Sequence, residues 1–323
     1  MFFRPLIACL GVFLACSAAL ADECSFIRKA ISDLPKGGGE VAIPGGTYTC
    51  QSPIVLDRDG ARLKGVGEVT LRLGRGVNAP VIVMGDAATP PRNLRDIQVA
   101  NLKIDGNRWY QKHECWGGPC DGGGTSFIRN NGITVRAVTR GRIENVFITG
   151  ARSGGVVTEK GCYDLTIDGL TATDNEFDGF AGYETYSARL TNMHLHGNRA
   201  AGISLDIRFH GNLFKDVRIE KNGDVGIFMR DANSNVFENV SVSDSGSHGV
   251  FVAQDFGPST CSSGNEFENL TVLRSRGSGF RLNDVCEGNR LTGTARFAQN
   301  RDGCISEAQG ARVEIGGAVK CED

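Results

Sequence analysis

The stretch from residue 177 to residue 246 decides the fold, because it consists of three similar lines: FDGFAGYETYSARLTNMHLHGNR, AAGISLDIRFHGNLFKDVRIEKNG and DVGIFMRDANSNVFENVSVSDSG. Each line has a glycine, a short alternating apolar run, a polar corner, and a second alternating run that ends in a polar or glycine-rich turn. The three lines are therefore units of an internal repeat. The rest of the chain either continues this repeat or caps it.

Two columns of residues step through the chain together, every 23 or 24 residues with one step of 30. The glycine column lies at 132, 155, 179, 202, 226, 249, 279 and 303, and an Asn/Asp/Gly column lies at 145, 169, 192, 216, 239, 269 and 293. Leucine-rich repeats have a similar period, but their Leu-x-x-Leu-x-Leu skeleton is missing. The alternating runs are strand patterns. Short strands, polar corners and a constant coil length predict an all-β chain, folded as a right-handed parallel β-helix.

Residues at fixed distances from each glycine can be given a direction, because successive side chains of a strand point to opposite faces. Positions one and three after the glycine are mostly apolar and are expected to face the interior, as in Ile203 and Leu205. Positions two and four then point outward. We expect the glycines and the Asn/Asp column to serve corners, where a positive φ is needed or short amides stack in a ladder.

The two ends of the chain carry different signals. Residues 1–21 combine one early charge, an apolar run and a small-residue ending, which predicts a signal peptide and a secreted or periplasmic chain that begins at Asp22. Residues 22–37 hold apolar side chains at helical spacing and are expected to form an N-terminal cap helix. Residues 22–323 are expected to be one domain, interrupted by insertion loops at about 106–130 and 254–263.

Nine cysteines remain after the leader is removed. In an oxidising compartment they are better explained by disulfides than by metal ligands. Their spacing offers the local pairs 24/50, 115/120, 261/286 and 304/321, which would leave Cys162 free. The chain has 35 basic and 37 acidic residues, and loss of Arg4 with the leader leaves a net charge of −3. This balance does not favour nucleic acid. We expect a monomer without a membrane span.

The residues at the fourth position after each glycine form an outward column. In four consecutive coils their side chains have functional groups that could take part in catalysis. Neighbouring strands are about 4.8 Å apart, so these four side chains would share one face over about 15 Å, the length of a few sugar units. An acid, a phenol, a second acid and a guanidinium follow one another there. The candidate catalytic residues are Glu159, Tyr183, Asp206 and Arg230.

Further charged residues are expected beside this column and are assigned to substrate binding. They are Arg136, Lys160, Glu184, Arg208, His210 and Asp231, with His113 reaching over from the first insertion loop. A cation beside carboxylates and a phenol suits uronic acid chemistry. The C5 proton of a uronate becomes removable when its carboxylate is neutralised, a base takes the proton and a second group supplies an acid.

The repeat resembles known carbohydrate-active families. A cap helix, a glycine-rich turn and a strand resemble the entry of pectate-lyase-like β-helix proteins, and residues 132–279 are similar to the catalytic β-helix of mannuronan C5-epimerases. Asp206, four residues after Gly202, matches that family's catalytic Asp. In the preceding coil the family has Asp-Pro-His, where this chain has Ala181, Gly182 and Tyr183. The resemblance implies a polysaccharide substrate, and the altered coil separates this chain from the epimerase motif.

Three functions therefore stay open. The first is C5 proton abstraction from a uronate polysaccharide, as an epimerase or a lyase. In it Tyr183 is the acid or base, Asp206 and Glu159 are acid, base or orienting groups, and Arg230, Arg208 or Lys160 neutralises the substrate carboxylate. The second is a glycoside hydrolase that uses two of Glu159, Glu184 and Asp206. The third is a non-catalytic carbohydrate-binding or envelope protein.

Metal binding has little support in the sequence. Two histidines at spacing two, His194 and His196, face the same side of a strand, and Glu220 on the next coil would have to be the third ligand. We interpret them as surface histidines and assign no metal ligand. No acidic calcium-binding repeat is visible, so no cofactor is assigned and Ca²⁺ stays open without support from the sequence.

Overall fold

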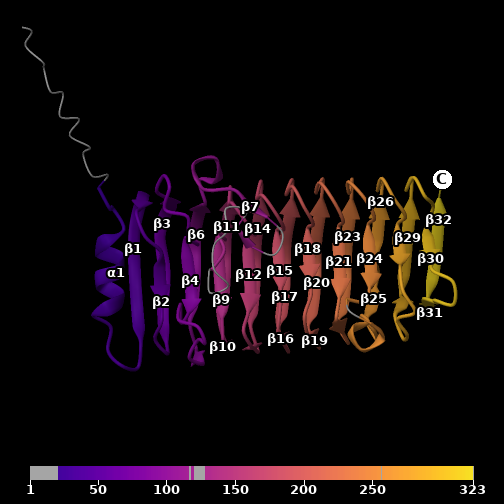
Figure 1. Ribbon diagram of the computed structural model, residues 1–323, viewed down its shortest axis with the longest axis horizontal. Helices are drawn as coiled ribbons and strands as arrows, with labels where there is room; N and C mark the ends of the chain where they lie inside the picture. Colours follow the sequence, from indigo (N-terminus) through magenta and orange to yellow (C-terminus); the bar gives the residue numbers. More distant parts are fainter. Residues whose placement is uncertain (1–20, 116–117, 120–127, 256, 323) are drawn as a thin grey trace, which may run out of the picture.

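A computed structural model describes residues 21–115, 118–119, 128–255 and 257–322. Over this range the chain is a right-handed parallel β-helix, confirming the predicted fold class, and Figure 1 shows its coils stacked along one axis. Three parallel sheets, called A, B and C below, form its sides. The longest path through sheet A crosses eleven strands, one for each coil.

The strands of sheet A are β1 (Gly39–Cys50), β3 (Ala61–Leu73), β6 (Gln98–Asp105), β11 (Arg142–Thr149), β14 (Thr166–Thr173), β17 (Arg189–His196), β20 (Leu213–Glu220), β23 (Val236–Ser243), β25 (Glu266–Glu268), β26 (Thr271–Leu273), β28 (Arg290–Thr292), β29 (Thr294–Ala298), β31 (Glu314–Ile315) and β32 (Ala318–Glu322). Those of sheet B are β2 (Ile54–Leu56), β4 (Ile82–Gly85), β9 (Ile133–Arg136), β12 (Val156–Glu159), β15 (Phe180–Gly182), β18 (Ile203–Leu205), β21 (Ile227–Arg230), β24 (Val250–Ala253), β27 (Phe280–Leu282) and β30 (Ile305–Glu307). Sheet C contains β5 (Leu94–Arg95), β10 (Val138–Thr139), β13 (Cys162–Tyr163), β16 (Thr185–Tyr186), β19 (Phe209–His210) and β22 (Ala232–Asn233).

The N-terminal end is covered by α1 (Ser25–Ser32), within the predicted cap. Ile27 and Ile31 are buried, and a disulfide joins Cys24 to Cys50 of β1. Figure 1 shows α1 alongside β1 at the indigo end. The helix therefore shields the first coil, whose apolar interior would otherwise be open.

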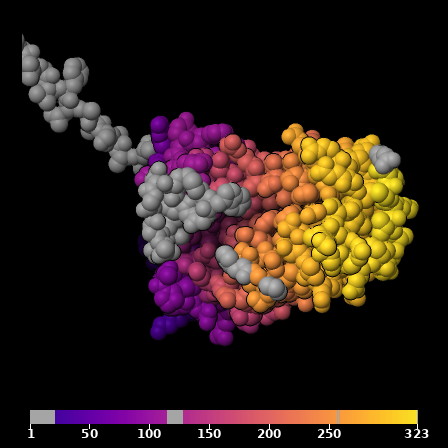
Figure 2. Space-filling view, turned by 45° about the vertical axis from the view of Figure 1, so that its right-hand side comes forward, coloured from indigo at the N-terminus to yellow at the C-terminus, as the bar shows by residue number. Residues whose placement is uncertain are grey.

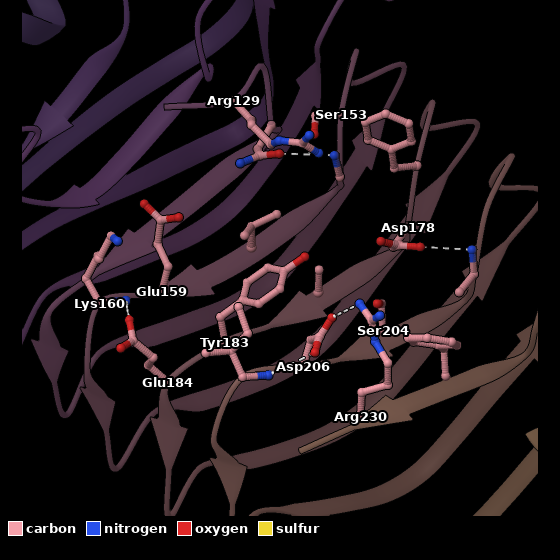
Figure 3. Close-up of a pocket in the computed structure, with 18 of the residues that line it drawn as sticks. Arg129, Ser153, Glu159, Lys160, Asp178, Tyr183, Glu184, Ser204, Asp206 and Arg230 are labelled. Carbon is pink, nitrogen blue, oxygen red and sulfur yellow. Dashed lines mark hydrogen bonds and ion pairs between the residues drawn. The ribbon is translucent and has the colours of Figure 1, made fainter. Parts of the chain in front are cut away.

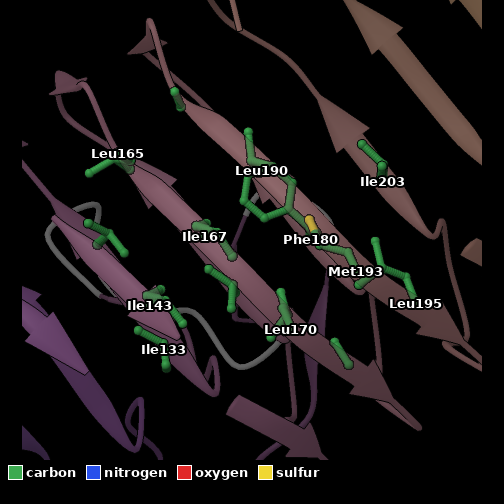
Figure 4. Packing of buried hydrophobic residues seen from close by; sticks show 14 of the residues in the cluster. Ile133, Ile143, Leu165, Ile167, Leu170, Phe180, Leu190, Met193, Leu195 and Ile203 are labelled. Carbon is green, nitrogen blue, oxygen red and sulfur yellow. The ribbon is translucent and has the colours of Figure 1, made fainter. Parts of the chain in front are cut away.

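The predicted inward positions do form the core. Phe180, Ile203 and Ile227 occupy equivalent positions in successive strands of sheet B and have no exposed surface. Figure 4 shows Phe180 beside Leu190 and Met193 of the facing sheet A. Burial of these columns along the whole axis is the main stabilising term of a solenoid, because each coil covers the apolar face of its neighbour.

The Asn/Asp column has the predicted corner role. Asn145, Asn192 and Asn239 have φ values of 51°, 53° and 55°. Their amides also form a ladder, in which Asn239 Nδ2 donates to Asp216 Oδ1 at 3.0 Å and Asn269 Nδ2 donates to Asn239 Oδ1 at 3.1 Å. Short polar side chains tolerate this left-handed backbone and satisfy one another from coil to coil.

A second asparagine ladder, which the sequence reasoning missed, is buried at the corner between sheets C and A. Asn212, Asn235 and Asn265 each donate Nδ2 to Oδ1 of the next member, at 3.0, 3.0 and 2.9 Å, and the last acceptor is Asn289. Each acceptor oxygen also receives a backbone N–H from the preceding coil, as Asn235 Oδ1 does from Asn212 at 3.0 Å. Buried polar corners are thereby satisfied without water.

The glycine column does not have the predicted role. Of its members, only Gly303 has a positive φ. A Cβ atom at Gly249 would lie 2.1 Å from Val272 Cγ1 and 2.6 Å from the carbonyl oxygen of Gly279. One at Gly226 would lie 2.3 Å from Val242 Cγ1. These glycines are needed because the backbone of sheet B approaches the core side chains of sheet A too closely for any side chain.

Three of the predicted disulfides are present: Cys24–Cys50, Cys261–Cys286 and Cys304–Cys321. Cys162 is free and buried, as predicted, and burial raises the pKa of its thiol to about 11. The predicted 115/120 pair lies outside the described residues, as do residues 1–20 of the predicted signal peptide. Cys261 and Cys286 tie the second insertion loop to the next coil.

Short elements occur in the described residues of the two insertion loops. The first holds the 3-10 turn η1 (Arg108–Tyr110) and the antiparallel pair β7 (Glu114–Cys115) and β8 (Gly118–Pro119). The second holds the turn η2 (Pro258–Thr260). In the part of the chain that the structure describes, no helix is long and apolar enough to cross a membrane.

We expect Gly249→Ala to lower the melting temperature clearly, because the added methyl group overpacks the core against Val272, a change that costs roughly 1–3 kcal/mol. Gly37→Ala is the matched control, since nothing lies within 4 Å of its Cβ position. Thermal unfolding of both variants, followed by circular dichroism, checks the difference. Equal melting temperatures would contradict the close-approach explanation.

Candidate functional site

A groove of about 720 Å³ crosses the outer face of sheet B over the coils of β12, β15, β18 and β21. Figure 2 shows the molecule hollowed across its middle coils, and Figure 3 shows the groove in close-up. The second position after each glycine forms its floor, with Val157, Ala181, Ser204 and Phe228 in register. Most of these floor residues are small, which leaves room for a ligand above the sheet.

The four predicted catalytic residues do come together. Glu159, Tyr183, Asp206 and Arg230 all line the groove, each from the end of a different strand or the residue after it. Parallel pairing places them on successive coils, as their shared position in the repeat predicted. Their catalytic roles stay predictions, because only their placement is observed.

Asp206 and Arg230 form the most developed ion pair of the groove. Arg230 Nη2 lies 2.5 Å from Asp206 Oδ2, and Arg230 Nη1 lies 3.2 Å from Asp255 Oδ1. The second partner, Asp255, comes from the insertion loop at 254–263. Asp206 is only 7% exposed, and this burial raises the pKa of its carboxyl against the opposing effect of Arg230. The pair holds a carboxylate in place beside the groove floor.

Tyr183 stands at the centre of the groove. In Figure 3 its hydroxyl points away from the strand that carries it, toward the side of the groove where Asp178 lies, and Asp206 lies beneath it in this view. Burial raises the pKa of this phenol, and the charges of Asp178 and Asp206 raise it further. Among the described residues, no hydrogen bond is made to the hydroxyl. The phenol therefore stays protonated near neutral pH and has a proton to offer to a ligand.

Asp178 is a groove residue that the sequence reasoning missed. It precedes Gly179, a position outside the two outward columns that we followed, and it is 3% exposed. Its Oδ1 accepts the backbone N–H of Ala201 at 2.9 Å. Burial raises the pKa of this carboxyl to about 7, and Asp224 and Asp206 nearby add to the rise. A carboxyl that titrates near neutrality is suited to acid or base work. Other coils carry Asn131, Gly154 or Ala201 at this position, and that contrast was the available signal.

Glu159 lines the groove, whereas its ion-pair partner Arg136 does not. Arg136 Nε lies 2.8 Å from Glu159 Oε1, but Arg136 is only 2% exposed and is not among the lining residues. Its guanidinium also donates to the carbonyl oxygens of Ala87 and Ala88, at 2.9 and 3.2 Å. Arg136, which was predicted to bind substrate, is thus covered by the segment after β4. It orients Glu159 through their ion pair.

The predicted residues at the corner after sheet B fall into two groups. Lys160 and Glu184 line the groove, and Glu184 is ion-paired with Arg208. Arg208 also donates its backbone N–H to Asp231 Oδ2 at 2.9 Å. Arg208, His210 and Asp231 do not line the groove. His210 lies on β19 of sheet C, and its Nδ1 accepts the backbone N–H of Asn233 at 3.1 Å.

The opposite wall of the groove comes from the coil before β12 and from residues that precede the strands. Arg129 lies over the ring of Phe177 at 5.2 Å and is 4.0 Å from Glu114 Oε2. Both Arg129 and Phe177 line the groove. His113 does not line the groove. Its Nδ1 lies 2.5 Å from Arg152 Nη2. This wall supplies a cation and an aromatic face, neither of which was predicted.

The assembled groove can bind a chain and move protons. Glu159 is ion-paired with Arg136, Glu184 with Arg208 and Asp206 with Arg230, so each of these three carboxylates has a cation one coil away. Asp178 and Tyr183 keep dissociable protons nearby. Active sites that use acid–base catalysis commonly give neighbouring titratable groups different pKa values.

Comparison with protein families gives one match. The model of the family described as "Periplasmic copper-binding protein (NosD)" matches residues 100–311. No curated protein matches the chain.

Solved structures share the fold at low sequence identity. The Azotobacter vinelandii mannuronan C-5 epimerase AlgE4 A-module is similar with a TM-score of 0.67 and 17% identity, covering 93% of this chain and 92% of its own. The periplasmic alginate epimerase AlgG, as a T265N mutant, has a TM-score of 0.56 and 13% identity over 87% and 84% of the two chains. The catalytic domain of a GH87 alpha-1,3-glucanase has a TM-score of 0.55 and 14% identity over 93% and 67%. At such low identities the structural similarity supports the β-helix fold only. The reaction has to be inferred from the side chains of the groove.

We expect Asp178→Asn to raise the melting temperature at pH 8 relative to the parent chain. The folded-state pKa of Asp178 is about 7, above the value of about 3.9 for an unfolded Asp. Its ionisation therefore opposes folding, and this cost grows as pH rises through that interval. At pH 4 the two chains should differ little. Thermal scans at both pH values measure the effect.

Asp168→Asn is the matched control, with the opposite sign. Hydrogen bonds from Thr191 and Asn192 lower the pKa of Asp168, so its carboxylate stabilises the fold above the unfolded-state pKa. The Asn variant should gain nothing at pH 8. An equal gain in both variants would show that the Asp178 effect does not come from its burial.

Proposed function

Because the chain belongs to the family described as "Periplasmic copper-binding protein (NosD)", we propose that it works in the periplasm or outside the cell, where its groove acts on a polysaccharide. The proposed reaction is proton abstraction at C5 of a uronate unit, as an epimerase or a lyase. One observation carries it, the Tyr183 phenol at the centre of the groove, whose pKa is raised by burial and by the nearby carboxyls of Asp178 and Asp206. The three disulfides suit such a compartment.

The residues of the groove divide the proton transfers among them. Lys160 lines the groove with an exposed side chain and is the proposed counter-charge to the uronate carboxylate. Arg208 and Arg230, the other predicted counter-charges, already bind carboxylates of the chain. Neutralising the uronate carboxylate stabilises the enolate that forms when the C5 proton leaves.

Asp206 is the proposed base and Tyr183 the proposed acid. Burial makes the Asp206 carboxylate more basic than an exposed one, while Arg230 keeps it ionised and oriented. Asp206 takes the C5 proton, and the bond electrons pass into the uronate carboxyl group. In epimerisation, Tyr183 returns a proton to the other face of C5. In elimination, the electrons form the C4–C5 double bond, the C4–O bond breaks, and Tyr183 protonates the leaving oxygen.

A glycoside hydrolase is the second candidate, and one observation favours it. Burial raises the pKa of the Asp178 carboxyl to about 7, while the neighbouring Asp206 is ion-paired with Arg230. An acid and a carboxylate in different environments form the usual pair for glycoside hydrolysis. Glu159 and Glu184, the other carboxylates predicted for this role, are tied to Arg136 and Arg208. A hydrolase would therefore use Asp178 and Asp206.

Copper, which the family description implies, does not fit the described residues. They contain no group of three or more His, Cys, Asp or Glu side chains that could share one metal ion. The two closest histidines, His194 and His196, lie on the outer face of β17, away from the groove. His194 Nε2 is 2.9 Å from Glu220 Oε2. The proposed chemistry therefore has no copper step.

The test is incubation with a panel of alginate, polygalacturonate and a neutral glucan. For the proposed reaction we expect C5 proton exchange by NMR, or the absorbance of an unsaturated uronate, with a uronate polymer only. Tyr183→Phe should lower kcat by about 100-fold or more, because the acid is removed while the ring is kept. Tyr48→Phe is the matched control, since its hydroxyl bonds to Pro44 in the capped end of the helix.

Each result distinguishes the candidates. New reducing ends without C5 exchange or an unsaturated product would replace proton abstraction with hydrolysis, and Asp178→Asn should then abolish the signal. Full activity in Tyr183→Phe would remove the phenol from the mechanism. No product from any polymer would overturn the proposed enzymatic function.

A further inference from the structure

A second hollow, of about 440 Å³, lies around the corner from the groove. Tyr163 and Tyr186 form its base, on neighbouring strands β13 and β16 of sheet C. Pro90 and Pro91 also line it. Nothing in the proposed proton transfers uses these four residues.

The two tyrosines form a rigid aromatic surface. Their ring centroids are 4.9 Å apart and their planes differ by 16°, so the rings stack. Tyr163 is 47% exposed, a large value for an aromatic side chain. His210 meets Tyr186 edge-on at 5.9 Å, which closes the aromatic run on the next coil. Stacked rings offer a large contact area that is already ordered, so little entropy is lost when a ligand covers it.

Charged groups at the edge of this surface connect it with the groove. Lys160 and Glu184 line both hollows, and Arg208 lines the second one. Glu184 accepts the backbone N–H of Lys160 at 3.2 Å and is ion-paired with Arg208. The two hollows are therefore continuous through residues whose positions are fixed by their own contacts.

We propose that Tyr163 and Tyr186 form an accessory sugar-binding platform, over which a polysaccharide chain continues after leaving the groove. This inference rests on the proposed function, because it assigns a second contact for the same chain. Apolar faces of sugar rings pack against aromatic rings, while their hydroxyl and carboxylate groups reach cations and carboxylates at the rim. Lys160 and Arg208 would meet an acidic sugar there, and the prolines would flank it.

The platform makes a prediction that depends on chain length. A short oligosaccharide fills the groove alone, whereas a long chain reaches both sites. The platform should therefore contribute to the binding of polymers and not to that of short oligomers. This separates it from a residue that acts on the reacting sugar.

The experiment measures binding of the full mature chain, with its disulfides intact, to alginate, polygalacturonate and a neutral glucan by affinity gel electrophoresis. Tyr163→Ala is expected to raise the Kd for the retarding polymer about fivefold to tenfold, as lost aromatic stacking would. Tyr163→Phe should bind like the parent chain. Phe147→Ala is the matched control, because this aromatic residue of β11 in sheet A is 38% exposed and remote from both hollows.

The platform and the proposed enzymatic function are overturned by different outcomes. An active enzyme whose polymer Kd is unchanged in Tyr163→Ala would overturn the platform and leave the proposed function intact. A chain without activity whose polymer binding still depends on Tyr163 would leave the platform and overturn the enzyme. Equal losses in Tyr163→Ala and Phe147→Ala, or no retardation of the parent chain by any polymer, would overturn the platform.

Discussion

The close approach of sheet B to the core side chains opposite it is the constraint on which the rest of the molecule depends. At every member of the glycine column except Gly303, a Cβ atom would lie within van der Waals distance of a core side chain or of the next coil's backbone. Glycine alone allows the coil to close to this width. A constant width lets every coil stack in register, and the in-register strands then bury the apolar columns continuously.

Register also creates the site. Residues from one position of the repeat become neighbours on adjacent strands, so a change in residue type along the chain becomes a change in chemistry along a groove. Stacking like charges at this spacing would be unfavourable, and the groove avoids it by pairing each carboxylate with a cation one coil away. Asp178 is not part of that pattern. Its burial, with other carboxyls nearby, raises its pKa to about 7.

The fold accommodates different reactions on the same scaffold. The similar structures include epimerases and a glucanase, all at low identity, and the family description refers to copper. None of these names transfers a reaction by itself, because activity resides in the side chains of the groove. Here those side chains are a buried phenol with a raised pKa, a carboxyl whose pKa burial raises to about 7 and an arginine-paired carboxylate, beside the aromatic surface that we propose as a sugar-binding platform.

The sequence by itself determined the features that depend on local periodicity. The coil length, the inward columns, the Asn/Asp corners and the shared face of Tyr183, Asp206 and Arg230 all followed from the repeat. Three disulfides followed from the spacing of the cysteines. The tertiary structure decided which of these residues are buried and which are accessible. Arg136 has the same repeat position as Arg230 but is buried, because the segment after β4 folds over it. Asp178 and the buried asparagine ladder were missed, and the glycines were assigned the wrong role. Burial and contact across the coil arise between residues far apart in sequence, and no count along the chain measures them.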